Sequence, residues 1–212
     1  MWRYLKKILG FDIFGKNIEL EFFRIAIHGD VDSLKDFLQK NPKLNLNLYD
    51  NDGMSVLHME HILADVAKIK LLKDKGMNLN IRDKIAGLTP LHYAVISGNL
   101  DAMQELIEFG ADIDVVCNNA DTALHYACDL NKEEAVNILL DSGANTSLRN
   151  KDNKTAKEIA RDKNNKDIIS LLDNKCLLAF AMAKHPRLGE KSNANALDDD
   201  MFKIIASFSR SR

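Results

Sequence analysis

The sequence has little of what secreted or membrane-spanning proteins are rich in. Its 212 residues include only three cysteines, Cys117, Cys128 and Cys176. They cannot all pair and none forms a CxxC motif, so we expect free thiols and a reducing compartment such as the cytoplasm. The longest uncharged run, Ile85–Leu100, covers 16 residues. A membrane-spanning helix needs about 20 mostly apolar residues, so the sequence predicts none.

An excess of positive charge is also missing. The chain has 29 Lys and Arg residues against 31 Asp and Glu, a formal net charge of −2. Nucleic-acid-binding domains usually have a clear basic excess, so we expect no nucleic-acid partner. Hydrophobic residues make up 46% of the chain and charged residues 28%. This balance is typical of a folded globular chain rather than a disordered one.

An internal repeat organises most of the chain. Four segments that end in histidine or glutamate recur at steps of 34, 33 and 33 residues: Ser55–His58, Thr89–His92, Thr122–His125 and Thr155–Glu158. Apolar residues follow at helical spacing, and a glycine stands eighteen residues after each of the first three segments. Projecting this frame back by 35 residues places Phe23 in a further unit. The pattern predicts five stacked units of two short helices each.

One unit carries a recognisable signature. Thr89-Pro90-Leu91-His92-Tyr93-Ala94 is followed by Gly98 and by Gly110-Ala111-Asp112. The unit resembles the ankyrin repeat, whose period is about 33 residues and whose signature is T-P-L-H-x-A. The resemblance implies an all-α solenoid of helix-turn-helix units joined by hairpin loops. It also implies a non-enzymatic, monomeric module that binds a protein partner and needs no cofactor or metal.

The expected organisation has three parts. They are an N-terminal amphipathic segment at 1–16, repeats at 17–174 and a C-terminal helical tail at 175–212. The expected units are 17–49, 50–83, 84–116, 117–149 and 150–174. We expect both terminal segments to cap the array. For residues 1–14 the alternative is a basic amphipathic helix that lies on a membrane surface.

Two departures from the repeat predict local irregularity. Glu60 stands where other units have alanine. A buried carboxylate is costly, so we expect the first helix of that unit to be shifted or loosened. Ala120 stands where Gly53 and Gly87 serve the turns of other units. Alanine tolerates a left-handed conformation poorly, so we expect a hairpin of different shape there.

The residues with catalytic or metal-binding potential have structural explanations. His58 and His61 are three apart on one helical face, as metal ligands can be. A repeat histidine, however, is expected to hydrogen-bond the backbone between units. Cys117 and Cys128 would need a base to act as nucleophiles, and their places in the repeat explain them without one.

The resemblance places partner contacts on hairpin tips and on the exposed face of each first helix. The expected contact residues are Asn51, Asp52, Met54, Ile62, Leu63, Ile85, Leu88, Ile96, Asn118, Asn119, Asp121, Asp129 and Leu130. The apolar members predict a patch across units two and three, beside a polar and acidic strip in unit four. In the alternative, Ile62 and Leu63 turn inward in the irregular unit two, or one end of the chain covers the patch.

The C-terminal tail resembles the opening helix of an F-box, L-P-x-E-I-L-x-x-I-F-x-Y, although Asp198 replaces the proline. The matching residues are Leu197, Asp200, Met201, Phe202, Ile205 and Phe208. This resemblance implies a second function, that of a substrate adaptor recruiting a host cullin-type ubiquitin ligase. Viruses and intracellular bacteria use host-directed proteins of this kind in the host cytosol. The competing interpretation is that the tail helix caps unit five.

Overall fold

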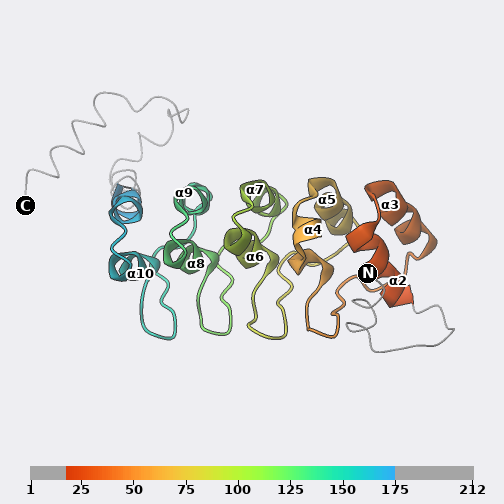
Figure 1. Ribbon diagram of the computed structural model, residues 1–212, viewed down its shortest axis with the longest axis horizontal. Helices are drawn as coiled ribbons and strands as arrows, with labels where there is room; N and C mark the ends of the chain where they lie inside the picture. Colours follow the sequence, from red (N-terminus) through yellow and green to blue (C-terminus); the bar gives the residue numbers. More distant parts are fainter. Residues whose placement is uncertain (1–17, 175–212) are drawn as a thin grey trace, which may run out of the picture.

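The computed structural model describes residues 18–174, which form a row of helix pairs (Figure 1). The first unit pairs α2 (Ile18–His28) with α3 (Val31–Lys40), and the second pairs a 3-10 turn, η1 (Val56–His58), and α4 (Glu60–Leu63) with α5 (Val66–Asp74). The third pairs α6 (Pro90–Ser97) with α7 (Leu100–Glu108), and the fourth α8 (Ala123–Asp129) with α9 (Glu133–Asp141). The fifth begins with α10 (Ala156–Asp162), and residues 166–174 are again helical. Residues 18–174 contain no strand, which confirms the all-α solenoid.

The helices lie in two rows. Figure 1 shows α3, α5, α7 and α9 side by side in one row, with α6, α8 and α10 in the other. Long loops project from the second row, away from the first. We call α2, η1 with α4, α6, α8 and α10 the inner helices, and their partners the outer helices.

The hydrophobic core runs between the rows and between successive units. Ala94, Ala127 and Ala160 are fully buried on consecutive inner helices. Their small side chains allow the inner helices of neighbouring units to pack closely, and these helices are in contact. The outer helices contribute buried pairs such as Met103 with Leu106 and Val136 with Leu139. Each unit thus buries its apolar faces against its neighbours.

Unit two is irregular, as its sequence predicts. The backbone of Met59 is extended (φ −88°, ψ 131°), which separates η1 from α4. The break leaves Glu60 exposed and turns Ile62 and Leu63 into the core. The side-chain amide of Asn99 donates to the carbonyl of Leu63 at 2.9 Å, which ties the end of α4 to unit three.

The expectation of a differently shaped hairpin at Ala120 is wrong. Ala120 has φ 61°, close to φ 76° at Gly53, φ 70° at Gly87 and φ 58° at Asn153. All four residues lie in the left-handed region. The hairpins at Gly53, Ala120 and Asn153 close over the same number of residues, whereas the unit-three hairpin closes from Asp83 to Leu88 and is one residue longer. The hydrogen bonds of the turn and the fixed spacing between units impose this conformation on alanine despite its strain of about 1 kcal/mol.

Candidate protein-binding surface

The inner helices of units two to four are anchored by a repeated histidine. The Nδ1 atoms of His92 and His125 accept the backbone N–H of Thr89 and Thr122, both at 3.2 Å, which completes a capping box. Their Nε2 atoms bond the carbonyls of Asp121 and Lys154 in the next unit, also at 3.2 Å. His58 differs, because its Nε2 bonds the carbonyl of Ile81 in its own unit at 3.1 Å, while its Nδ1 accepts the N–H of Ser55 at 2.9 Å.

These bonds commit both nitrogens of each imidazole ring. Burial lowers the pKa of His92 to about 4 and also lowers the pKa of His58, so both rings are neutral at pH 7. His58 therefore has no free nitrogen for a metal, and His61 is exposed. Within residues 18–174 no group of three or more His, Cys, Asp or Glu side chains could hold a metal ion.

The two described cysteines are also structural. Cys128 is fully buried, and burial raises the pKa of its thiol to about 12. Cys117 is buried in a hairpin, where its Sγ accepts the N–H of Asn119 at 3.3 Å. The thiol of Cys128 stays protonated at neutral pH and makes a poor nucleophile.

The loops form hairpins that hold one another at a fixed spacing. In each hairpin one backbone N–H closes the turn, as from Cys117 to the carbonyl of Asp121 at 2.8 Å. Neighbouring tips are joined by backbone bonds, from Lys84 to Gly53, from Asn118 to Ala86 and from Lys151 to Asn119, at 2.8–3.0 Å. The side chains on the tips are thus held in a regular row.

The unit-three hairpin presents one large apolar side chain to solvent. The carboxylate of Asp83 accepts the N–H groups of Ile85 and Ala86 at 2.7 Å and of Leu88 at 2.8 Å. Burial alone would raise the pKa of Asp83, but these three donors hold it below its usual range. The turn leaves the Ile85 side chain 70% exposed, the largest exposure among the big apolar residues described.

The structure divides the expected contact residues into exposed, half-buried and buried groups. Eight are exposed: Asn51, Asp52, Ile85, Ile96, Asn118, Asn119, Asp129 and Leu130. Met54 and Asp121 are half-buried, and the sulfur of Met54 accepts the Tyr93 hydroxyl at 3.3 Å. The patch expected across units two and three is therefore smaller and centred on unit three.

Three of these residues are buried. Ile62 and Leu63 face the core because of the break at Met59, so the alternative expectation for them is confirmed. Leu88 is only 8% exposed, so the expectation that it is exposed is wrong. Its N–H and carbonyl both bond Asp83, which holds Leu88 against the array.

Sequence reasoning missed a column of half-buried side chains on the inner helices. It comprises Met59, Tyr93, Tyr126 and Ile159, each one residue after the repeat position. Burial raises the pKa of Tyr93 and of Tyr126 to about 12, so both hydroxyls stay neutral. A large residue recurring at this position in four units was the available signal.

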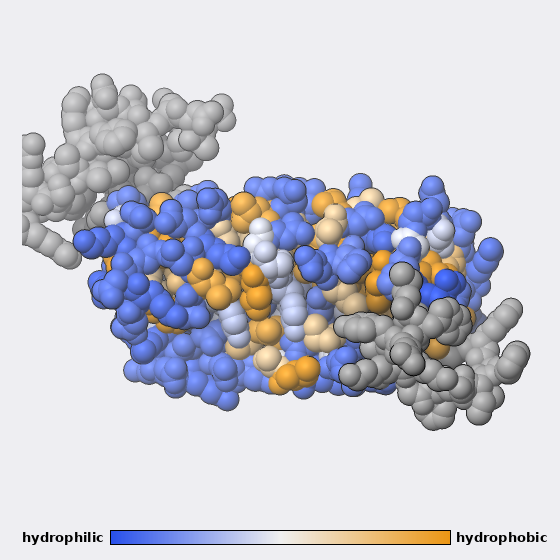
Figure 2. Space-filling model, viewed as in Figure 1, coloured by the Kyte–Doolittle hydropathy of each residue, from blue (hydrophilic) through white to orange (hydrophobic). Residues whose placement is uncertain are grey.

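Two further apolar residues extend this surface. Ile96 is 38% exposed and lies three residues after Tyr93, and Leu130 is 41% exposed and lies four after Tyr126. At these spacings each pair shares one helix face. Figure 2 shows apolar atoms towards the middle of the array, whereas the loops at the α10 end are hydrophilic. We call Ile85, Tyr93, Ile96, Tyr126 and Leu130 the apolar strip.

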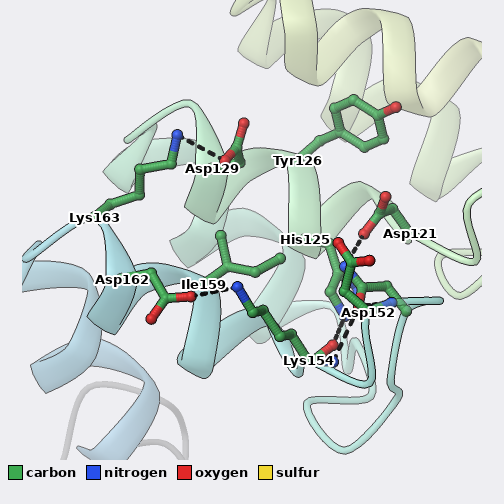
Figure 3. A pocket seen from close by; sticks show the side chains of 10 residues that line it. Asp121, His125, Tyr126, Asp129, Asp152, Lys154, Ile159, Asp162 and Lys163 are labelled. Atoms are coloured by element: carbon green, nitrogen blue, oxygen red, sulfur yellow. Dashed lines mark hydrogen bonds and ion pairs between the residues drawn. The ribbon is translucent and has the colours of Figure 1, made fainter.

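Beside the strip lies an acidic hollow of about 330 Å³ between units four and five (Figure 3). It is lined by Tyr126, His125, Ile159 and Asn150, by four aspartates (Asp121, Asp129, Asp152 and Asp162) and by two lysines (Lys154 and Lys163). Lys163 pairs with Asp129 at 2.9 Å and Lys154 with Asp162 at 2.7 Å. No ion pair joins Asp121 or Asp152 to a cation within residues 18–174.

The sequence matches the family model of ankyrin repeats in three overlapping copies, over residues 22–117, 61–150 and 103–179. The chain belongs to the ankyrin-repeat family. Ankyrin repeats are generally protein-interaction modules, and the histidine caps, hairpins and paired helices described above are the parts of that module. The F-box-like resemblance falls on residues 197–208, and the N-terminal segment on residues 1–16. Both lie outside the described residues.

Relatives of known name match over part of the chain. A putative ankyrin repeat protein of fowlpox virus is 41% identical over 86 residues, which are 41% of this chain and 20% of that protein. A putative ankyrin repeat protein of Rickettsia felis is 34% identical over 79 residues, 37% of this chain and 26% of that protein. Human protein phosphatase 1 regulatory subunit 27 is 33% identical over 93 residues, 44% of this chain and 59% of that protein. The matches thus span less than two thirds of each relative.

No helix within residues 18–174 is long and apolar enough to cross a membrane.

Proposed function

We propose that this ankyrin array is a non-enzymatic module that docks a partner protein on the surface formed by its hairpin tips and inner helices. The observation that carries the proposal is the apolar strip, with Ile85 70% and Ile96 38% exposed on one unit. Large apolar side chains that are exposed on one unit and have polar neighbours are typical of protein-docking sites.

The polar neighbours of the strip supply that rim. Asn118, Asn119 and Asp129 are exposed on unit four, and Asn51 and Asp52 on the tip of unit two. The backbone hydrogen bonds between neighbouring hairpin tips hold these side chains at fixed spacing before a partner binds. A preorganised surface loses less conformational freedom on binding than a mobile one.

The test replaces the two exposed isoleucines of unit three. The variant Ile85→Asp/Ile96→Asp places two charges on the strip, and Gln104→Asp places one on the outer helix of the same unit, where Gln104 is exposed. We expect wild type and Gln104→Asp to capture the same proteins from a cell lysate, and the double variant to lose them at an unchanged melting temperature. Equal capture by all three proteins would contradict the proposal.

A second candidate function is that of a substrate adaptor for a cullin-type ubiquitin ligase in a host cytosol. Its support is the spacing of Leu197, Met201, Phe202, Ile205 and Phe208, together with the viral and rickettsial relatives. In this proposal the array holds the target and residues 197–208 bind the ligase, in the helix-in-groove mode. Capture by a chain lacking 197–212 would then retain the target and lose the ligase subunits. Retention of both would contradict it.

A further inference from the structure

We propose that the partner presents a lysine or arginine side chain to the acidic hollow and an apolar side chain to the apolar strip. This inference rests on the proposed function and adds the chemistry of the partner. It starts from the distribution of charge around the hollow, where four aspartates face two lysines.

Both lysines of the hollow are already committed. Figure 3 shows Lys163 reaching Asp129 and Lys154 reaching Asp162, whereas Asp121 and Asp152 lie on the other side of the hollow. Asp121 accepts one bond from the Asn150 side-chain amide at 2.7 Å, which fixes its orientation without neutralising its charge. Neither carboxylate makes an ion pair among the described residues. The pKa of Lys154 is raised chiefly by its bond to Asp162 and also by Asp152, but that lysine is paired with Asp162, so a further cationic side chain complements the two aspartates.

The hollow and the strip are parts of one surface. Tyr126 belongs to both, because it lines the hollow and shares a helix face with Leu130. Tyr93 occupies the equivalent position one unit earlier, on the same face as Ile96. Packed helices lie about 9 Å apart, and an extended chain advances about 3.3 Å per residue. The apolar residue is therefore expected about three positions from the basic one.

The experiment selects ligands from random sequences, so the natural partner need not be identified first. The full chain is used to select short random peptides displayed on phage, alongside Asp121→Asn/Asp152→Asn. Asparagine keeps the size of each side chain and an oxygen that can accept the bond from Asn150. The control, Asp101→Asn/Glu134→Gln, removes two charges from exposed positions on the outer helices of units three and four.

The proposal predicts that wild type and control enrich peptides with Lys or Arg about three positions from a large apolar residue. The Asp121→Asn/Asp152→Asn variant should keep the apolar preference and lose the basic one. It should bind the best wild-type peptide about tenfold more weakly, since two partly exposed charge contacts are removed. Replacing the basic peptide residue by alanine should weaken binding to wild type but not to the variant.

The possible outcomes separate this inference from the proposed function. Apolar enrichment without basic enrichment, or basic enrichment that persists in the variant, would overturn the inference alone. If no peptide is selected and Ile85→Asp/Ile96→Asp changes nothing, the proposed function also fails. A last variant, Lys184→Glu/Arg187→Glu/Lys191→Glu, tests the chain's own tail. If only this variant binds basic peptides, the tail occupies the hollow and the partner assignment is wrong.

Discussion

At the residue scale, His92 stabilises the array only while its ring is neutral. In His92 one nitrogen accepts the N–H of Thr89 and the other bonds the carbonyl of Asp121. A protonated ring has no acceptor, so protonation breaks the cap. Burial lowers the pKa of His92 from 6.5 to about 4. Between these two values the unfolded chain binds more protons than the folded one, so stability falls as the pH decreases.

This linkage gives a pH prediction. The contribution of His92 is fully present above about pH 6.5, and about 2 kcal/mol of it is lost by pH 5. His58 acts in the same direction, because burial lowers its pKa too. The pKa values of Asp83 and Glu158 are also lowered, but these carboxyl groups change stability only below pH 5, outside the range from pH 5 to pH 7. Urea unfolding at pH 7 and pH 5 measures the difference, which His92→Gln should reduce by that amount. An undiminished difference would contradict the assignment.

A second residue-scale prediction concerns the strained turn at Ala120. Its φ of 61° is sterically unfavourable for alanine, whereas glycine adopts this angle without steric cost. Ala120→Gly should therefore raise the free energy of unfolding by about 0.5–1 kcal/mol. Asn153 has φ 58° at the equivalent position, and asparagine tolerates this conformation. Asn153→Gly is thus the matched control and should change stability by only a few tenths of a kcal/mol. Equal effects of both changes in urea unfolding would show that Ala120 is not strained.

At the element scale, the break in the inner helix of unit two reverses which side chains face the core. Ile62 and Ile96 occupy the same repeat position, yet Ile62 is fully buried and Ile96 is 38% exposed. The extended backbone at Met59 accounts for the difference. In units three to five an alanine at this position is buried in a continuous helix. Glu60 cannot be buried there at low cost, and the break before it keeps its carboxylate exposed.

The matched pair Ile62→Ala and Ile96→Ala tests this rearrangement. Ile62→Ala should lower the free energy of unfolding by about 2–5 kcal/mol, because it leaves a cavity between α4 and its neighbours. Ile96→Ala removes a partly exposed side chain and should cost less than about 1 kcal/mol. Chemical denaturation of both variants provides the comparison. Similar losses would mean that α4 presents the same face as α6.

The elements also show what could be predicted from the sequence. The helix pairs and the irregular unit two follow from periodicity and from Glu60, because each depends on residues close in the chain. The bonds of His92 and His125 to the next unit follow from the ankyrin resemblance. The burial of Leu88 could not be predicted, because its hydrogen bonds to Asp83 decide it. The turn at Ala120 could not be predicted either, because the backbone bonds between neighbouring hairpins decide it. The acidic hollow was missed for a similar reason, since it combines Asp121 with Asp152 and two lysines from the next unit.

At the scale of the whole molecule, a repeat array depends on how its last unit is covered. Ile168 and Leu172 are buried at the end of the described chain, whereas Ile169 and Leu171 are only partly buried. The apolar residues Met201, Phe202, Ile205 and Phe208 are spaced to form one helix face, and such a face must be buried somewhere. Covering unit five and docking a ligase subunit are competing uses of that face.

The melting temperature of a chain that lacks residues 197–212 distinguishes between these two uses. If the tail covers unit five, deletion removes about 2 kcal/mol of apolar burial and should lower the melting temperature by several degrees. If it docks a partner, the melting temperature should not change and ligase subunits should disappear from the captured proteins. We expect the first result, because the neighbouring apolar side chains of the chain are present at a far higher effective concentration than any partner. The control is Met201→Leu/Phe202→Leu in the full chain, which keeps an apolar face and should retain the melting temperature of the wild type. An unchanged melting temperature with no lost partner would contradict both uses, and the tail would then have no role in either capping or ligase recruitment.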